Sequence, residues 1–327
     1  MRKTTTVRGL AAIAAVTVMQ TQMAKANEMW TGELPNIKSA TPEGVLPPPG
    51  VYGQLDNYFA QFETFDSVGN KIPSASINAL IEVPTLLWVP GITVLGANYG
   101  VAVAIPFVYN SYQPLQRATP GPGNLGLFNT VIAPAILSWT LSQHLFVSTT
   151  AAFLLPDQTN DKLDLYRGSL KNGGAPTGNS YSSFMPSLGL TWMDNGWTLN
   201  VGLRVSLTLG PTTSEASFYY QNPYGAVSWL NGYHYHTGDF FVGDYTLTKT
   251  FGAWSFGGAI FNSFQLQKDT LNGQPVPGSI YRSFSIGPVI GYQFKSGMGI
   301  TALWGHSVTT NNGVGGDAFD LRLTTRF

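Results

Sequence analysis

The sequence contains no cysteine and very little charge. Only 10% of its 327 residues are Asp, Glu, Lys or Arg, whereas soluble domains carry about 25%. This deficit argues against a soluble globular protein and favours a fibrous, aggregating or membrane protein. Because the net charge is zero, no basic field attracts nucleic acid, and we expect no nucleic-acid partner. The absence of cysteine excludes disulfide bonds and is compatible with export.

Beyond the first 26 residues, the sequence also lacks any uninterrupted apolar run that could form a transmembrane helix. Such a helix needs about 20 consecutive apolar residues. Residues 83–156 carry a single formal charge, Arg117, but proline, glycine, asparagine and serine interrupt this stretch repeatedly. The remaining way to cross a bilayer is a closed β-barrel, because an open sheet would leave unpaired backbone groups in hydrocarbon.

The N-terminal region is typical of a secretory signal peptide. A basic start is followed by an apolar stretch of 11 residues, Gly9 to Met19, which is too short to span a bilayer. The motif "AKA" at 24–26 fits the small-residue rule for cleavage. We therefore expect residues 1–26 to be a signal peptide, and a retained anchor is the alternative.

What the sequence does contain is strict two-residue alternation. In the terminal "FDLRLTTRF", Phe319, Leu321 and Leu323 share one face and charged or polar residues occupy the other, as in a half-buried β-strand. The pattern recurs along the chain and predicts an all-β fold, a transmembrane antiparallel β-barrel. We expect about twelve strands, near residues 51–63, 75–89, 95–109, 126–140, 143–155, 181–194, 197–210, 238–251, 254–266, 281–294, 298–308 and 317–327.

The connections between the expected strands alternate in length. Tight ones include "DNG" at 194–196, and long ones include 156–180 and, more modestly, 309–316. Short periplasmic turns and long external loops are typical of outer-membrane barrels. The sequence therefore predicts that residues 51–327 form a barrel in the Gram-negative outer membrane. Large side chains would face lipid and lipopolysaccharide, and small or polar ones would face a wet lumen.

The last strand has to pair with the first in a closed barrel, which leaves it no free edge. Phe327 would then lie at the periplasmic interface. Outer-membrane barrels in general end on an aromatic residue that the barrel insertion machinery reads. That resemblance implies that Phe327 is an assembly signal and that the machinery is a partner.

Strand parity directs several charged side chains into the lumen. An Arg that faces lipid at mid-depth costs about 2–4 kcal/mol, which supports the inward orientation. These groups either form ion pairs that hold the barrel's shape or form a selectivity constriction, and the two interpretations overlap. The expected channel-lining residues are Asp56, Glu82, Arg204, Asp244, Asp320, Arg322 and Arg326.

The lumen of such a barrel has an intermediate size. Barrels of about eight strands are filled by side chains, and those of about sixteen or more leave an aqueous channel. Small inward residues on several expected strands leave space. The proline-rich segment 27–50 either enters the lumen as a plug or leads directly into the first strand.

Prolines recur inside the expected strands. Pro106 and Pro134 lie on neighbouring ones, the third and the fourth. Each lacks a backbone N–H, so we expect bulges that bend the wall. Either the bulges only shape the barrel, or one of them opens a lateral exit between the third and fourth strands.

Several motifs resemble the outer-membrane transporter family associated with meta-pathway phenol degradation. They are "LPPPGVY" from Leu46, "VLGANYGVAVAIPFV" from Val94, "LGLFNTVIAPAILSW" from Leu125 and the terminal "DLRLTTRF". The resemblance implies uptake of small hydrophobic or aromatic compounds. The chain departs from the family at Asn129, where an acidic residue is expected, and at 156–158, where "PDQ" replaces an expected Pro-Thr-Gly turn.

The predicted function is therefore passive transport of a small hydrophobic solute, without catalysis, metal or cofactor. A structural or adhesive barrel is one alternative. An outer-membrane lipid hydrolase is another, but Ser307 directly follows His306 and so points to the opposite face of its strand. His234 and His236 share a strand face without an evident third metal ligand.

Overall fold

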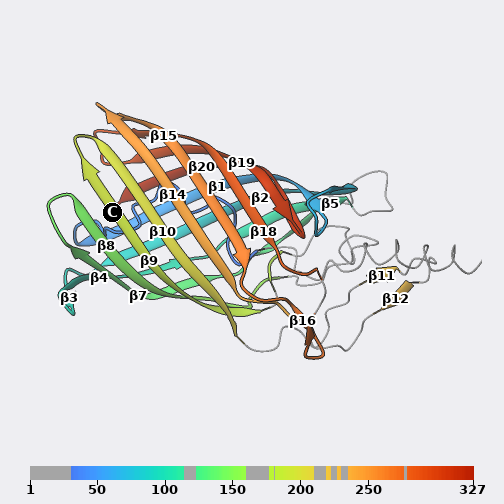
Figure 1. Cartoon of the computed structure of the whole chain (residues 1–327). Coiled ribbons are helices and arrows are strands. Elements are labelled where there is room, and N and C mark those ends of the chain that lie inside the picture. Colours follow the sequence, from blue (N-terminus) through green and yellow to red (C-terminus); the bar gives the residue numbers. More distant parts are fainter. Residues whose placement is uncertain are drawn as a thin grey trace, which may run out of the picture.

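The protein folds into a closed antiparallel β-barrel of twelve strands, seen here in a computed structural model (Figure 1). The all-β barrel predicted from the sequence is confirmed. The structure describes residues 31–113, 123–159, 177–179, 181–209, 219–221, 227–229, 235–275 and 278–327. The expected signal peptide lies outside these ranges. Within them, no helix is long and apolar enough to span a membrane.

Most wall strands are continuous, and two are interrupted. The third strand consists of β4 (Ala97–Ala104) and β5 (Phe107–Gln113), and the fourth of β6 (Asn124–Leu127) and β7 (Val131–Thr140). The continuous strands are β1 (Gly50–Phe65), β2 (Lys71–Val89), β8 (Leu145–Leu154), β9 (Ser182–Asp194), β10 (Trp197–Leu209), β14 (Phe240–Phe251), β15 (Trp254–Gln265), β18 (Arg282–Gln293), β19 (Gly299–Asn311) and β20 (Gly313–Arg326).

Short strands occur outside the main wall. β3 (Thr93–Val94) pairs with β4 at a turn, and the others pair among themselves in two small sheets. These are β11 (Tyr219–Gln221), β12 (Val227–Trp229), β13 (Tyr235–His236), β16 (Thr270–Leu271) and β17 (Gln274–Pro275).

The first and last strands close the barrel. β1 and β20 pair without a register shift from Tyr52↔Arg326 to Phe65↔Gly313. The backbone N–H of Phe327 then donates to the Val51 carbonyl at 2.9 Å. The terminal strand is therefore hydrogen-bonded on both sides, which removes the exposed edge that an open sheet would have.

One end of the barrel carries tight hairpins and the C-terminus (Figure 1). Asn195 and Gly196 have φ values of 48° and 77°, the left-handed conformation that a two-residue hairpin needs. The expected long connections leave the strands at the opposite end, with two corrections. The expected loop at 64–74 shortens to residues 66–70, because β1 runs to Phe65 and β2 begins at Lys71. The expected loop at 309–316 is a tight turn, because β19 runs to Asn311 and β20 begins at Gly313. Asn312, at φ 56°, reverses the chain between them.

Large apolar side chains cover the outside of the wall. On β15, Phe256, Ile260 and Phe264 are exposed, whereas the intervening Phe261 and Ser263 are buried. This arrangement is the inverse of a soluble barrel, which packs its large residues inward. An apolar outer surface is what a hydrocarbon environment requires.

Candidate functional site in the barrel lumen

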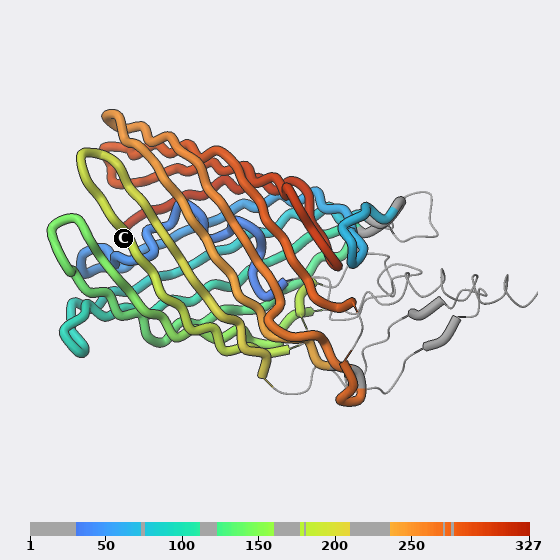
Figure 2. Tube along the Cα trace, viewed as in Figure 1, coloured from blue at the N-terminus to red at the C-terminus, as the bar shows by residue number. Residues whose placement is uncertain are grey.

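Residues 31–49 lie inside the ring of strands, where the blue start of the chain is visible in Figure 2. Their polar groups bond to inward side chains from widely separated strands. The Gly44 N–H donates to Thr191 Oγ1 on β9 at 2.8 Å, and Ser39 Oγ donates to Asp244 on β14 at 2.7 Å. We call residues 31–49 the lumen segment.

Arg204 of β10 is the main ionic anchor of the lumen segment. Its Nε and one terminal nitrogen reach the two carboxylate oxygens of Glu33 at 2.6 and 2.8 Å, and its other terminal nitrogen reaches Glu43 at 3.1 Å. Arg204 also pairs with Asp244 of β14. All four side chains are buried or nearly so. A bidentate arginine–carboxylate pair of this kind adds geometric specificity as well as interaction energy.

Arg322 of β20 forms a second anchor, through backbone groups. It pairs with Asp56 at 2.5 Å and with Asp320 at 3.2 Å. It also donates to the carbonyl oxygens of Ile37 at 2.7 Å and Ser39 at 2.9 Å. One guanidinium therefore joins the first strand, the last strand and the lumen segment.

Glycines on the inner wall make room for the lumen segment. A Cβ added at Gly189 of β9 would overlap the backbone of Glu43, and one at Gly305 of β19 would overlap the Asn36 side chain. The Glu43 carboxyl occupies the space beside Gly202 of β10. Small inward residues do leave space, as expected from the sequence, and the lumen segment fills part of it.

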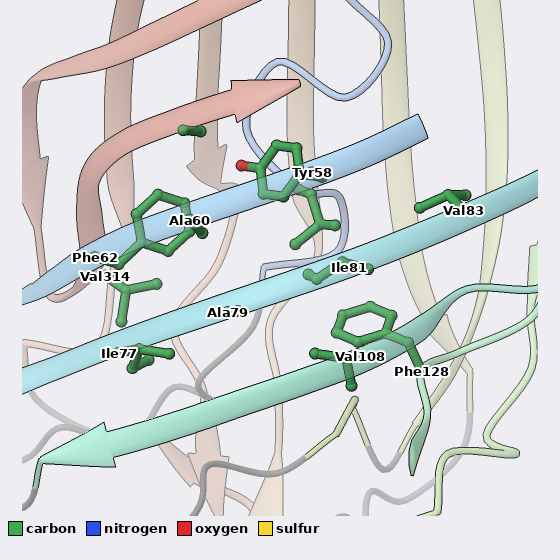
Figure 3. Close-up of a cluster of buried hydrophobic side chains, with 12 residues drawn as sticks. Tyr58, Ala60, Phe62, Ile77, Ala79, Ile81, Val83, Val108, Phe128 and Val314 are labelled. Atoms are coloured by element: carbon green, nitrogen blue, oxygen red, sulfur yellow. The ribbon is translucent and has the colours of Figure 1, made fainter. Parts of the chain in front are cut away.

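One side of the remaining lumen wall carries a large apolar cluster. The cluster comes from β1, β2, β5 and β20 together with Phe128, which points toward Ile81 and Val108 (Figure 3). Leu34 of the lumen segment packs against it. We call this set the apolar face; its members on the wall are Tyr58, Ala60, Phe62, Ile77, Ala79, Ile81, Val83, Val108, Phe128, Val314 and Ala318.

The wall is interrupted beside the apolar face. The third and fourth strands pair at Ala104↔Val131 and again at Phe107↔Leu127. Between these pairs, the Phe128 N–H donates to the Pro106 carbonyl at 2.8 Å. We call this interruption, formed by residues 105–106 and 128–130, the wall break.

Asn129 closes the inner side of the wall break. Its side chain is fully buried, donates to the carbonyls of Leu155 and Asn179, both at 2.8 Å, and reaches Gln158 Oε1 at 3.1 Å. Asp157 accepts from the Thr130 N–H at 2.9 Å. The two departures from the family pattern, Asn129 and "PDQ" at 156–158, therefore contact each other in space.

Pro134 does not lie at the wall break. The register shift beside it, between Ile132 and Ala135, affects the pairing of β7 with β8. Pro134 itself is exposed and accepts a hydrogen bond from the Tyr99 hydroxyl at 2.6 Å. The pairing of β7 with β4 of the third strand also shifts here, between Gly100↔Ile136 and Ala102↔Ala133. The wall is therefore irregular on both sides of Pro134.

The predicted channel-lining residues separate into three groups. Asp56, Arg204, Asp244, Asp320 and Arg322 are buried in the two anchors. They are therefore engaged in ion pairs, which was one of the two interpretations of the sequence.

Arg326 and Glu82 differ from the others. Arg326 is exposed at the barrel mouth, where it donates to the Pro49 carbonyl at 2.9 Å. The expected inward orientation of Glu82 is wrong. Glu82 is exposed between the buried Ile81 and Val83, because both faces of β2 are rich in apolar residues and parity alone did not identify the inner one.

Sequence reasoning missed the lumen partners of the two anchors. Glu33, Glu43 and Ser39 had no assigned role, although the two carboxylates in an otherwise weakly charged chain were a usable signal. Their partners could not be read locally, since Arg204 lies 171 residues from Glu33. Asn129 was noted as a departure from the family, but its contacts with the following loop depend on the fold.

A second polar cluster lies on the outer wall. His306 Nδ1 lies 2.9 Å from Asp317, and the Trp304 indole N–H donates to the same carboxylate at 3.0 Å. Ser307 aligns with the buried Ser285 and so faces inward. Ser307, the serine considered for a hydrolase, therefore lies on the opposite side of the wall from His306 and Asp317 and cannot form a catalytic arrangement with them. Among the described residues, no group of three acidic or histidine side chains could hold a metal ion. His234 lies outside them.

A closed antiparallel barrel with an apolar outer wall has the fold of Gram-negative outer-membrane barrels. The family model described as "Putative MetA-pathway of phenol degradation" matches residues 63–323. The chain belongs to this family, and the resemblance seen in its motifs is confirmed.

One solved structure agrees with the fold, and a second is more distant. An outer-membrane channel from Pseudomonas putida F1 superimposes with a TM-score of 0.71 at 11% identity, over 89% of this chain and 100% of that one. The β-domain of the Bordetella autotransporter BrkA reaches a TM-score of 0.48 at 9% identity, over 85% and 100%. At 11% identity, the first likeness establishes the fold alone. No curated protein sequence matches the chain.

Proposed function

We propose that the protein is an outer-membrane channel for passive uptake of small hydrophobic or aromatic compounds. The solute enters the lumen from outside, passes along the apolar face and leaves sideways into the membrane at the wall break. The observation that carries the proposal is the position of the apolar face. Its residue Phe128 belongs to the interrupted fourth strand itself.

The chemistry of the apolar face suits such a solute. Tyr58, Phe62, Ile77, Ile81 and Val108 are buried inside the barrel, whereas a channel for ions or sugars needs a hydrated lining. A solute that reached the bilayer directly would avoid the aqueous periplasm, where apolar surface is costly to hydrate. The wall break offers that route because its backbone pairing is incomplete.

The lumen segment acts in this proposal as a plug that has to move. It is held by ion pairs and hydrogen bonds, which can exchange without breaking covalent bonds. The Arg204 anchor holds its Glu33 and Glu43 side chains, and the Arg322 anchor holds the backbone of Ile37 and Ser39. Two separate anchors suit a plug that shifts in part while staying attached.

Uptake by whole cells tests the proposal. A porin-deficient Gram-negative host producing the full chain should accumulate radiolabelled toluene faster than the same host with an empty vector. A small sugar of similar mass should enter both hosts at the same rate. Equal toluene uptake in the two hosts, with the barrel present and heat-modifiable on gels, would contradict the proposal. Faster sugar uptake would indicate a general pore instead.

A further inference from the structure

Three hydroxyl side chains form a row on the inner face of β15, β18 and β19. Ser263 of β15 aligns with Ser283 of β18, and Ser283 aligns with Thr310 of β19. The three are 1%, 4% and 4% exposed, on the inner face of adjacent strands. Neighbouring strands are about 4.8 Å apart, so the hydroxyls are spaced closely enough for one ligand to reach more than one of them. We call them the hydroxyl row.

The hydroxyl row lacks the partners that buried hydroxyls normally have. None of the three oxygens has a hydrogen-bond partner in the described part of the chain. Ser283 lies near the Tyr281 hydroxyl without normal hydrogen-bond geometry. Buried polar groups are nearly always satisfied, and leaving one unpaired costs about 1–3 kcal/mol. Three adjacent unpaired hydroxyl groups indicate that a polar group of a ligand bonds to them here.

Aromatic side chains lie on both sides of the hydroxyl row along the strands. Toward the long connections, Phe240 and Tyr281 meet edge to face, with ring centroids 6.1 Å apart. Toward the tight hairpins lies the buried Phe261. The Tyr281 hydroxyl donates to the carbonyl of Val314 at 3.3 Å, which places the row next to the apolar face.

Charge in the lumen selects against anions. In the two anchors, the guanidinium groups of Arg204 and Arg322 face five carboxyl groups, those of Glu33, Glu43, Asp56, Asp244 and Asp320. Both guanidinium groups are already fully engaged. A carboxylate solute would add negative charge to this excess, and neither guanidinium group is free to pair with it.

We propose that the hydroxyl row is a solute-binding site for neutral aromatic compounds that carry a hydroxyl or carbonyl oxygen. This inference rests on the proposed function and adds the chemistry of the solute. The oxygen bonds to Ser263, Ser283 or Thr310, and the ring packs between the aromatic side chains and the apolar face. The same ring with a carboxylate group is rejected, and the ring without oxygen passes without binding at the row.

Three solutes that differ in one group test the site: toluene, p-cresol and p-toluate. Binding to the purified full chain is followed by ligand-observed NMR, and uptake is measured in the porin-deficient host. The wild-type protein should bind p-cresol more tightly than toluene and should bind p-toluate least. A variant with Ser263→Ala, Ser283→Ala and Thr310→Val should lose p-cresol affinity by about fivefold or more, the value of one or two hydrogen bonds. Its affinity for toluene should be unchanged.

Ser255→Ala provides a matched control. Ser255 has the inward parity of Ser263 on the same strand, but lies close to the tight hairpin at Gly252. This variant should leave the preference for p-cresol over toluene intact. If the triple variant does not fold, Thr310→Val alone replaces it in the test, and the expected loss of p-cresol affinity is smaller.

The outcomes separate this inference from the proposed function. If cells take up toluene but the triple variant keeps the wild-type preference for p-cresol, the hydroxyl row is not the site and the channel stands. A parallel loss for toluene and p-cresol would also overturn the site, since it would reflect altered packing. If no solute enters faster than in the vector control, the channel proposal fails, and the NMR measurement still decides whether the row binds.

Discussion

Arg204 of β10 donates hydrogen bonds to both carboxylate oxygens of Glu33, at 2.6 and 2.8 Å, although the two residues are 171 positions apart in the sequence. The same guanidinium holds Glu43 and Asp244. A single buried cation therefore pairs with three carboxyl groups. Removing the cation and removing one carboxylate should consequently have very different effects.

Arg204→Met should free the lumen segment. The substitution leaves three buried carboxyl groups without their cation, and breaking a buried pair in this way costs about 3–5 kcal/mol. We expect a lower unfolding temperature and a larger single-channel conductance in planar bilayers. Glu33→Gln should have a milder effect, because two carboxylates remain on the guanidinium and one like charge is gone. Arg282→Met, which removes an exposed arginine on β18, is the control. Wild-type conductance in Arg204→Met would contradict the anchoring role.

Gly44→Ala should displace the lumen segment at a different point. A Cβ at this position would overlap the carbonyl oxygen of Phe146 and the nitrogen of Thr191, both backbone atoms of the wall. Since the wall cannot yield there, the segment has to, and conductance should rise. Gly32→Ala is the matched control, because its Cβ would lie 3.0 Å from the Ser206 hydroxyl, a side chain that can rotate. Equal conductance of the two variants would show that the close approach of Gly44 to the wall does not hold the lumen segment in place.

A crosslink at the wall break should block lateral exit. Ala104→Cys with Val131→Cys joins Cα partners on the third and fourth strands, and the chain has no other cysteine. Once oxidised, this variant should lose uptake of toluene and regain it with a reductant. Leu190→Cys with Val201→Cys, also Cα partners, places the bond in an intact part of the wall and should leave uptake unchanged. Full uptake with the Ala104–Val131 bond confirmed would redirect the solute to the axial lumen.

Phe327→Ala should lower the amount of assembled barrel. Phe327 is 78% exposed at the hairpin end, so its ring is available to a partner, and its backbone N–H already bonds to Val51. The backbone bond survives the substitution, which isolates the contribution of the ring. Heat-modifiable protein in outer-membrane fractions measures assembly, with Phe294→Ala, another aromatic near a tight turn, for comparison. Normal levels of the Phe327 variant would rule out recognition through the ring.

The strands could be predicted closely because their signal is local. Two-residue alternation placed the seventh strand at 197–210, and β10 runs from Trp197 to Leu209. The turn "DNG" was also predictable from local sequence, since Asn195 and Gly196 accept left-handed φ values. Register and closure then follow from keeping one face apolar over the whole ring.

The candidate site was less predictable because it depends on distant pairings. Glu82 was placed on the wrong face, since Ile81 and Leu80 are equally apolar and alternation gives no preference. Pro106 was identified as a weak point, but its partner in the break is the chain at 128–130, which Asp157 and Gln158 hold from the next loop. No local pattern reports such contacts.

The Arg322 anchor also links the filling of the barrel to its closure. The lumen segment directly precedes β1, yet Arg322 lies on β20, the last strand, and donates to Ile37 and Ser39. The strand that closes the barrel therefore also holds the lumen segment in place. Contacts between such remote parts of a chain form late and slowly. The final step of folding should therefore decide at once whether the barrel is closed and what it encloses.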